Sequence, residues 1–282
     1  MTPRTYTPAL VLPLLLAACA STPPTPPSSP TPPPPSAPPP PHTPPSGPAQ
    51  SPQATPPVQD ATPSKSTPTE PEWREVFPGV RLSRAQRWVE FDGKVPFNPH
   101  DPATPITYLE VIACRPDSRE HEAVVVADAM PSQVHAALLL AGAVPGSPAA
   151  WRWDDQSLTF IPPKGSRLDV TLAWTDPAGL RREHPAADLV LHAEHKQPLA
   201  QRSPGDGFVF AGSGIVGHTS PGRYAADLSG TLVGLHTFGD EPIAWSAYFN
   251  PDAGAEDPVW ILNADLCPPV GTVITVRLRV ID

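Results

Sequence analysis

Basic residues and cysteines are both scarce in this 282-residue sequence, and each shortage argues against a class of function. Lysine and arginine together number 19, against 28 aspartates and glutamates, so the formal net charge is −9. Because a surface that binds phosphate is basic, this balance argues against nucleic acid as a partner. Only three cysteines are present, Cys19, Cys114 and Cys267. An iron–sulfur cluster needs about four thiolate or imidazole ligands, so no such cluster is expected.

The sequence also lacks a usable cofactor motif. Residues 212–217 match the letters GxGxxG and follow a predicted strand. A dinucleotide fingerprint must open a helix, however, and the following segment 218–222, with its proline and glycine, does not permit one. We therefore expect a glycine-rich turn here and no bound cofactor.

The first 18 residues have the pattern of a signal peptide. A positive charge at Arg4 precedes an apolar run over residues 9–16, which is shorter than the roughly 20 residues of a membrane-spanning helix. Leu16-Ala17-Ala18-Cys19 resembles the lipobox of a bacterial lipoprotein. The resemblance implies lipid transfer to the Cys19 thiol and cleavage before it, whereas ordinary signal-peptide cleavage would leave Cys19 unmodified.

The expected location follows from this lipobox. Two or more acyl chains make a lasting attachment, so the membrane is an expected partner through lipidated Cys19. Ala20 follows the cysteine, where an aspartate would favour retention in the inner membrane. We expect a lipid-anchored protein of the cell envelope, on the outer membrane and facing the periplasm or the cell surface.

Residues 19–72 are predicted to be a disordered, proline-rich tether. Proline, serine, threonine and alanine dominate the segment, which has no aromatic residue and therefore cannot form a core. Proline runs at 32–35 and 38–41 favour polyproline II, a semi-rigid spacer. As alternatives, the runs could be docking ligands for partner domains, or the serines and threonines could carry sugars.

Residues 73–282 contain all seven tryptophans and have the length of one folded domain. Apolar and polar residues alternate over 168–174 and 274–280, which predicts strands with one packed face and one wet face. Further strands are predicted at 88–91, 106–114, 123–127, 208–211, 231–235 and 260–262, with turns that include 92–93 and 176–179.

One helix is predicted, at about 132–143. Ser132 is a suitable N-cap and Gly142 a stop signal. Apolar residues lie nearly all round the segment, so we expect the helix to be largely buried against the sheet. The predicted fold class is α+β, a mostly antiparallel sheet with one buried helix.

Several segments of this domain resemble the YdjY-domain family, whose members are envelope proteins frequent in planctomycetes. The resemblance lies first in residues 109–114, 118–122 and 131–142. Matches at 77–80, 89–93, 174–179, 208–214 and 268–274 extend it over essentially the whole folded part. The family implies no established activity. Some members carry a ferredoxin-like label, which the two cysteines of the folded part cannot support.

Cys114 and Cys267 have two interpretations. In an oxidising envelope they could form a disulfide that closes a loop of about 150 residues and stabilises by up to about 5 kcal/mol. Alternatively, they are separate buried thiols, as expected for a cysteine within a strand.

His121, Glu122 and His135 are the candidate polar or metal site. His121-Glu122 precedes a predicted strand and His135 lies in the first turn of the helix that follows. An imidazole and carboxylate set can bind a metal or transfer protons. Alternatively, His135 is a core histidine bonded to Glu122 or to the backbone.

Two functions remain open. The first is a tethered, non-catalytic domain that binds or scaffolds an envelope protein or polysaccharide, peptidoglycan among them. The second is a metal-dependent or acid/base enzyme that uses His121, Glu122 and His135.

Overall fold

A computed structural model describes residues 71–281, apart from 154–156, 218–220, 253 and 255. The chain divides into two units, Met1–Pro63 and Ser64–Asp282, and all described residues belong to the second. The predicted signal peptide, Cys19 and nearly all of the tether lie outside the described residues. Within these residues, no helix is long and apolar enough to span a bilayer.

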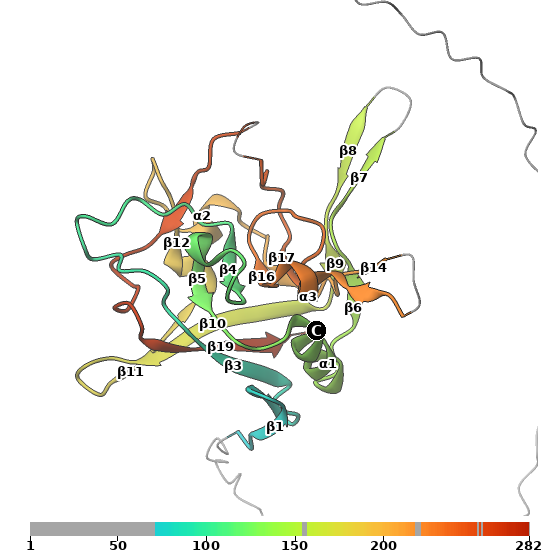
Figure 1. Ribbon diagram of the computed structural model, residues 1–282, viewed down its shortest axis with the longest axis horizontal. Helices are drawn as coiled ribbons and strands as arrows, with labels where there is room; N and C mark the ends of the chain where they lie inside the picture. Colours follow the sequence, from blue (N-terminus) through green and yellow to red (C-terminus); the bar gives the residue numbers. More distant parts are fainter. Residues whose placement is uncertain (1–70, 154–156, 218–220, 253, 255, 282) are drawn as a thin grey trace, which may run out of the picture. The chain divides into compact units, whose positions relative to one another are not determined.

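Eight strands form a closed barrel of mixed direction (Figure 1). Their order around the barrel is β3 (Trp88–Lys94), β19 (Val273–Val280), β10 (Arg167–Thr175), β13 (Phe208–Val209), β17 (Ile243–Trp245), β16 (Thr231–Gly234), β4 (Val111–Cys114) and β5 (Ala123–Val126). Pairing of Lys94 with Val126 joins β5 back to β3. The pairs β16–β17 and β4–β5 are parallel and the other six are antiparallel, so the predicted antiparallel sheet is correct only in part.

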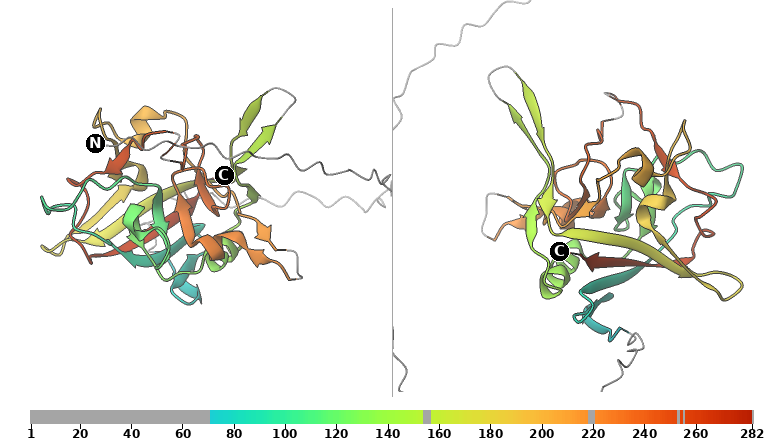
Figure 2. Two further views of the ribbon diagram at one scale, coloured as in Figure 1. Left: turned by 45° about the horizontal axis from the view of Figure 1, so that its top comes forward. Right: turned by 180° about the vertical axis from the view of Figure 1, so that it is seen from behind.

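Shorter elements decorate this barrel. β1 (Arg74–Phe77) and β2 (Val80–Ser83) extend the sheet beyond β3, and β11 (Arg181–Pro185) pairs with β10. Four two-stranded ribbons are β12 (Val190–His192) with β18 (Trp260–Leu262), β14 (Ile215–Val216) with β15 (Arg223–Tyr224), β6 (Pro145–Ser147) with β9 (Lys164–Gly165), and β7 (Ala150–Trp153) with β8 (Leu158–Ile161). The remaining elements are α1 (Pro131–Leu140), α2 (Leu199–Arg202), α3 (Ala225–Ser229), η1 (Glu120–Glu122) and η2 (Ala186–Leu189). The β7–β8 ribbon projects from the barrel in both Figure 1 and Figure 2.

The alternation predicted for β10 and β19 is confirmed. Leu172 pairs with Val276 and Val170 with Leu278, and all four side chains are buried in the core. The outward-facing positions of the two strands include charged and hydroxyl side chains, namely Asp169, Thr171, Thr275, Arg277 and Arg279. Period-two patterning therefore set the register of the longest pair of strands.

Two predicted boundaries are wrong for identifiable reasons. The predicted turn at 92–93 lies inside β3, where a Cβ on Gly93 would lie 2.4 Å from a Val125 methyl and 2.6 Å from the Val126 carbonyl oxygen. This glycine permits the close approach of β3 and β5 and does not make a turn. The predicted strand at 106–114 begins only at Val111, and Tyr108 makes an isolated bridge with Ile261.

The predicted helix exists as α1, but its cap and its burial differ from the prediction. Met130 is the N-cap and Pro131 the first helical residue, a favourable place for proline. The amide of Ser132, the predicted N-cap, donates instead to Asp227 Oδ1 of α3 at 2.8 Å. The last two residues, Leu139 and Leu140, are exposed, so the helix buries one side and is not enclosed.

Candidate functional site

His121, Glu122 and His135 do not converge. His121 Nε2 lies 3.6 Å from Glu122 Oε1 at the surface, and 73% of the His121 side chain is exposed. His135 lies elsewhere, with Nδ1 2.9 Å from the Tyr224 hydroxyl, which donates to the Gly212 carbonyl at 3.0 Å. The predicted pairing of His135 with Glu122 is not observed. In the described part of the chain, no three His, Cys, Asp or Glu side chains are placed to hold a metal.

The surroundings of His135 are those of a structural histidine. Its ring meets Phe210 at 4.8 Å and Tyr224 at 5.5 Å between centroids, both nearly edge to face. Burial lowers its pKa, so the neutral form is favoured. His135 therefore joins α1 to the loop at Gly212 through packing and the Tyr224 hydroxyl.

Glu122 has an acidic partner that the sequence analysis missed. Glu110 and Glu122 immediately precede the parallel strands β4 and β5, and the Glu110 amide donates to the Glu122 carbonyl at 3.0 Å. Burial raises the pKa of Glu110 to about 7, helped by a hydrogen bond to the Glu122 carboxyl and by its charge, while Arg119 opposes the rise. Burial beside a second carboxyl group therefore favours the protonated form of Glu110 up to about neutral pH. No signal in the sequence indicated this pair, because Glu110 lies inside the strand predicted at 106–114 and the parallel pairing of β4 with β5 is a feature of the structure.

Cys114 and Cys267 are free and buried, so the candidate disulfide is not formed. Burial raises the pKa of Cys267 to about 12 and also raises that of Cys114. Thiols held protonated in this way are poor nucleophiles and poor metal ligands. The interpretation as two separate buried thiols is the one that the structure shows.

A polar cavity of about 370 Å³ lies where the β10–β11 turn meets the loop that follows β18. We call it the Trp174 pocket. Its lining comes from two segments of the chain: Trp174, Thr175, Asp176, Pro177, Arg182 and His184 from the turn, and Asp265, Leu266, Cys267, Pro268, Pro269 and Thr272 from the loop. Both segments contain residues through which the sequence resembles the YdjY-domain family.

Local structure holds the turn side of this pocket in place. Asp176 Oδ1 accepts the amides of Ala178 and Leu180 at 3.0 and 2.9 Å, and Oδ2 accepts Arg182 Nε at 2.8 Å. The Leu180 amide is the main reason that the pKa of Asp176 is lowered. Asp176 and Arg182 therefore form a fixed, charge-compensated pair at the edge of the pocket.

The remaining polar groups of the pocket are free to bind. His184 stacks on Trp174 with 5.4 Å between ring centroids and 28° between planes. Neither ring nitrogen of His184 makes a hydrogen bond to another described residue, and the same holds for the carboxylate of Asp265. The pocket thus offers an imidazole and a carboxylate beside an aromatic ring, an arrangement that can orient a small polar molecule.

A larger cavity of about 620 Å³ at the β3–β5 seam is a weaker candidate. Its walls are mainly apolar, with Val95, Pro96, Val126, Val270 and Val273 among them. Two of its carboxylates are already engaged: Asp92 by Arg81 and Thr275, and Glu120 by the amides of Asp117 and Ser118. Lys94 and Asp128 also line it, but the largely apolar walls suit a hydroxyl-rich ligand less well than the Trp174 pocket does.

The fold and the pocket define a mixed eight-stranded barrel domain with a small polar cavity beside the β10–β11 turn. A family model described as the YdjY domain matches residues 80–279, and the chain belongs to this family. The match runs from β2 to all but the last residue of β19 and so confirms the resemblance. No curated protein and no solved structure matches the chain.

Proposed function

We propose that this protein is an envelope lipoprotein, anchored through Cys19 on the 19–72 tether, whose domain binds a saccharide unit of the envelope in the Trp174 pocket. The observation that carries the proposal is the pair of uncommitted polar side chains, His184 and Asp265, in a cavity of about 370 Å³ beside Trp174. This is a binding role and requires no cofactor. An enzyme built on His121, Glu122 and His135 is not proposed, because the three side chains lie apart.

The charges in the pocket favour a hydroxyl-rich ligand over an anion. Arg182 is compensated by Asp176, so Asp265 leaves the pocket with a net negative charge. A phosphate or carboxylate would be repelled, whereas sugar hydroxyls can donate to the carboxylate and accept from the imidazole. Peptidoglycan is the saccharide that a lipoprotein of the envelope meets, and its uncharged sugar is N-acetylglucosamine, so the N-acetylglucosamine disaccharide is the first ligand to test.

Removing either free polar group should weaken saccharide binding. His184→Ala and Asp265→Ala are each expected to raise the Kd for the soluble N-acetylglucosamine disaccharide about tenfold, since each removes hydrogen bonds to a buried ligand. Isothermal titration calorimetry measures this change. Arg181→Ala is the matched control, because Arg181 neighbours Arg182 on β11 but is paired with Glu183 and does not line the pocket. No binding by the unmodified protein, or equal weakening in the control, would contradict the proposal.

The anchor is tested separately. Cys19→Ala removes the proposed acyl acceptor and should move the protein from the detergent-extracted membrane fraction to the soluble or unprocessed fraction. Immunoblotting of the fractions after membrane sedimentation measures the shift. A variant that remains membrane-bound and is processed normally would show that Cys19 does not carry the anchor.

A further inference from the structure

The projecting β7–β8 ribbon has one apolar face. Cross-strand pairing sets Trp151 opposite Phe160 and Trp153 opposite Leu158. These four side chains occupy alternate positions and share a face, while Arg152 and Thr159 form a pair on the other. A short strand pair that leaves the barrel thus carries two tryptophans on the same side.

The inner half of this face is covered by the protein itself. Tyr248 meets Trp151 at 4.9 Å and Phe160 at 5.0 Å between ring centroids, and Trp151 meets Phe160 at 5.4 Å. The three rings form a compact cluster at the base of the ribbon. They stabilise a two-stranded element that pairs with no further strand among the described residues.

The outer half of the face lies open. Trp153 is 74% exposed and Leu158 is 44% exposed. Exposing an indole of this size to water is unfavourable, and large exposed aromatic groups commonly mark a binding surface. Tyr248 packs on the inner half with its ring at 86° to the Trp151 plane and at 51° to the Phe160 plane. The outer half has the same kind of surface with nothing from the described residues on it.

We propose that Trp153 and Leu158 form a platform for a sugar ring of an envelope polysaccharide. The platform would be a second saccharide subsite, distinct from the Trp174 pocket, and its assignment to a saccharide rests on the proposed function. The face of a pyranose ring presents C–H groups, which carry a partial positive charge, and the face of an indole is negative. The C–H face of a pyranose ring can therefore lie on the exposed indole face of Trp153.

The size of the open surface supports a sugar over a protein. A tryptophan buries about 150–250 Å² when fully covered, so Trp153 and Leu158 together offer only a few hundred Å². A stable protein partner or a second copy of this chain needs about 800 Å² on each side. The open surface is thus too small for a lasting protein interface but matches one or two sugar rings.

Sedimentation with purified peptidoglycan sacculi tests the platform in the full mature protein. Trp153→Ala should reduce the fraction that sediments with sacculi about tenfold, and Trp153→Phe, which keeps a flat ring, should retain much of the binding. Ile215→Ala is the matched control, because Ile215 is also exposed, at 69%, but lies on the β14–β15 ribbon. Circular dichroism is expected to show the same fold for all three variants.

The outcomes separate this platform from the pocket. Loss of sacculus binding in Trp153→Ala, with the same calorimetric result for the soluble disaccharide as in the unmodified protein, supports the platform. This holds even if the unmodified protein does not bind the soluble disaccharide, so failure of the pocket and failure of the platform are distinguishable. Sedimentation of Trp153→Ala at the wild-type level would overturn it. It would equally be overturned if ultracentrifugation showed that Trp153→Ala converts a dimer into a monomer while leaving sacculus binding intact, since the ribbon would then join two copies.

Discussion

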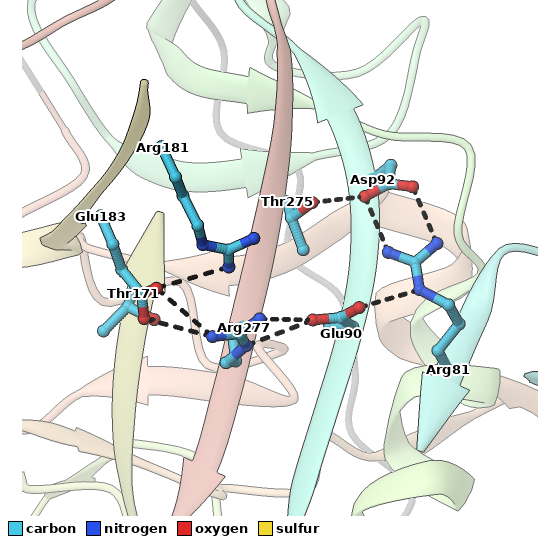
Figure 3. A network of polar contacts seen from close by, with 8 residues as sticks. All are labelled: Arg81, Glu90, Asp92, Thr171, Arg181, Glu183, Thr275 and Arg277. Atoms are coloured by element: carbon cyan, nitrogen blue, oxygen red, sulfur yellow. Dashed lines mark hydrogen bonds and ion pairs between the residues drawn. The ribbon is translucent and has the colours of Figure 1, made fainter. Parts of the chain in front are cut away.

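Replacing Glu90 by alanine is expected to lower the free energy of unfolding of the domain by about 3 kcal/mol. Glu90 lies on the outer face of β3 and is only 6% exposed. It accepts from Arg81 Nε at 2.9 Å and from Arg277 Nη2 at 3.1 Å (Figure 3). The Arg277 side chain is 12% exposed, and its guanidinium lies 4.8 Å from the centroid of the Trp88 ring. Removing Glu90 therefore leaves a largely desolvated cation without its main partner.

The same network supplies the control for this change. Glu183, at the far end of the network, is more exposed, at 38%, and bonds Arg277 Nη1 at 3.3 Å and Arg181 Nη2 at 3.4 Å. Glu183→Ala should therefore cost less than about 1 kcal/mol, as is usual for ion pairs in contact with water. Urea denaturation of both variants at neutral pH measures the difference. Equal small losses would show that Glu90 is as solvated as Glu183.

The network shows how charged residues on the outside of the barrel are paired with one another. Figure 3 shows Arg81, Glu90, Arg277, Glu183 and Arg181 alternating in charge across β2, β3, β19 and β11. Each neighbouring pair joins two different strands, except for Glu183 and Arg181, which both lie on β11. The polar face that alternation predicted for β19 is thus a set of cross-strand ion pairs that also fixes the order of these strands.

Local patterning in the sequence was enough to find the long strands. β10 and β19 were predicted because their alternating residues face a core on one side and water on the other, which is a property of each strand alone. The helix was found for a similar reason, although Asp227, from a distant helix, took the capping role expected of Ser132. Structural features that depend on a single segment of the chain could therefore be predicted from the sequence.

Structural features that depend on contact between two distant segments could not be predicted from the sequence. The single Lys94–Val126 pair that closes the barrel gives no periodic signal, and Gly93, which permits it, was interpreted as a turn. The Trp174 pocket combines a β-turn with a loop about 90 residues later, so neither segment alone indicated a cavity. The candidate site of His121, Glu122 and His135 is not formed. Closeness in sequence suggested it, but closeness in sequence does not determine which side chains are in contact.

Glu110→Gln is expected to stabilise the domain at about pH 8 and to change it little at about pH 4.5. The pKa of Glu110 rises from its ordinary 4.5 to about 7 in the folded state, chiefly through burial and then through Glu122. At low pH both folded and unfolded states hold the proton, and burial of the neutral acid is not penalised. As pH rises from 4.5 to 7 the unfolded state releases its proton first, so stability falls, and above 7 the full cost remains.

Glutamine keeps the shape and can donate a hydrogen bond to Glu122, but it has no charge to bury. Each pKa unit corresponds to about 1.4 kcal/mol, and since 18% of the Glu110 side chain is exposed, solvent screening reduces the gain at about pH 8 to about 1–2 kcal/mol. Thermal or urea unfolding across this pH range measures it. Glu194→Gln, at a side chain that is 81% exposed, is the control and should follow the unmodified protein at every pH. If the stability of Glu110→Gln also matched that of the unmodified protein at every pH, burial of Glu110 would not be the cause of the loss of stability above pH 7.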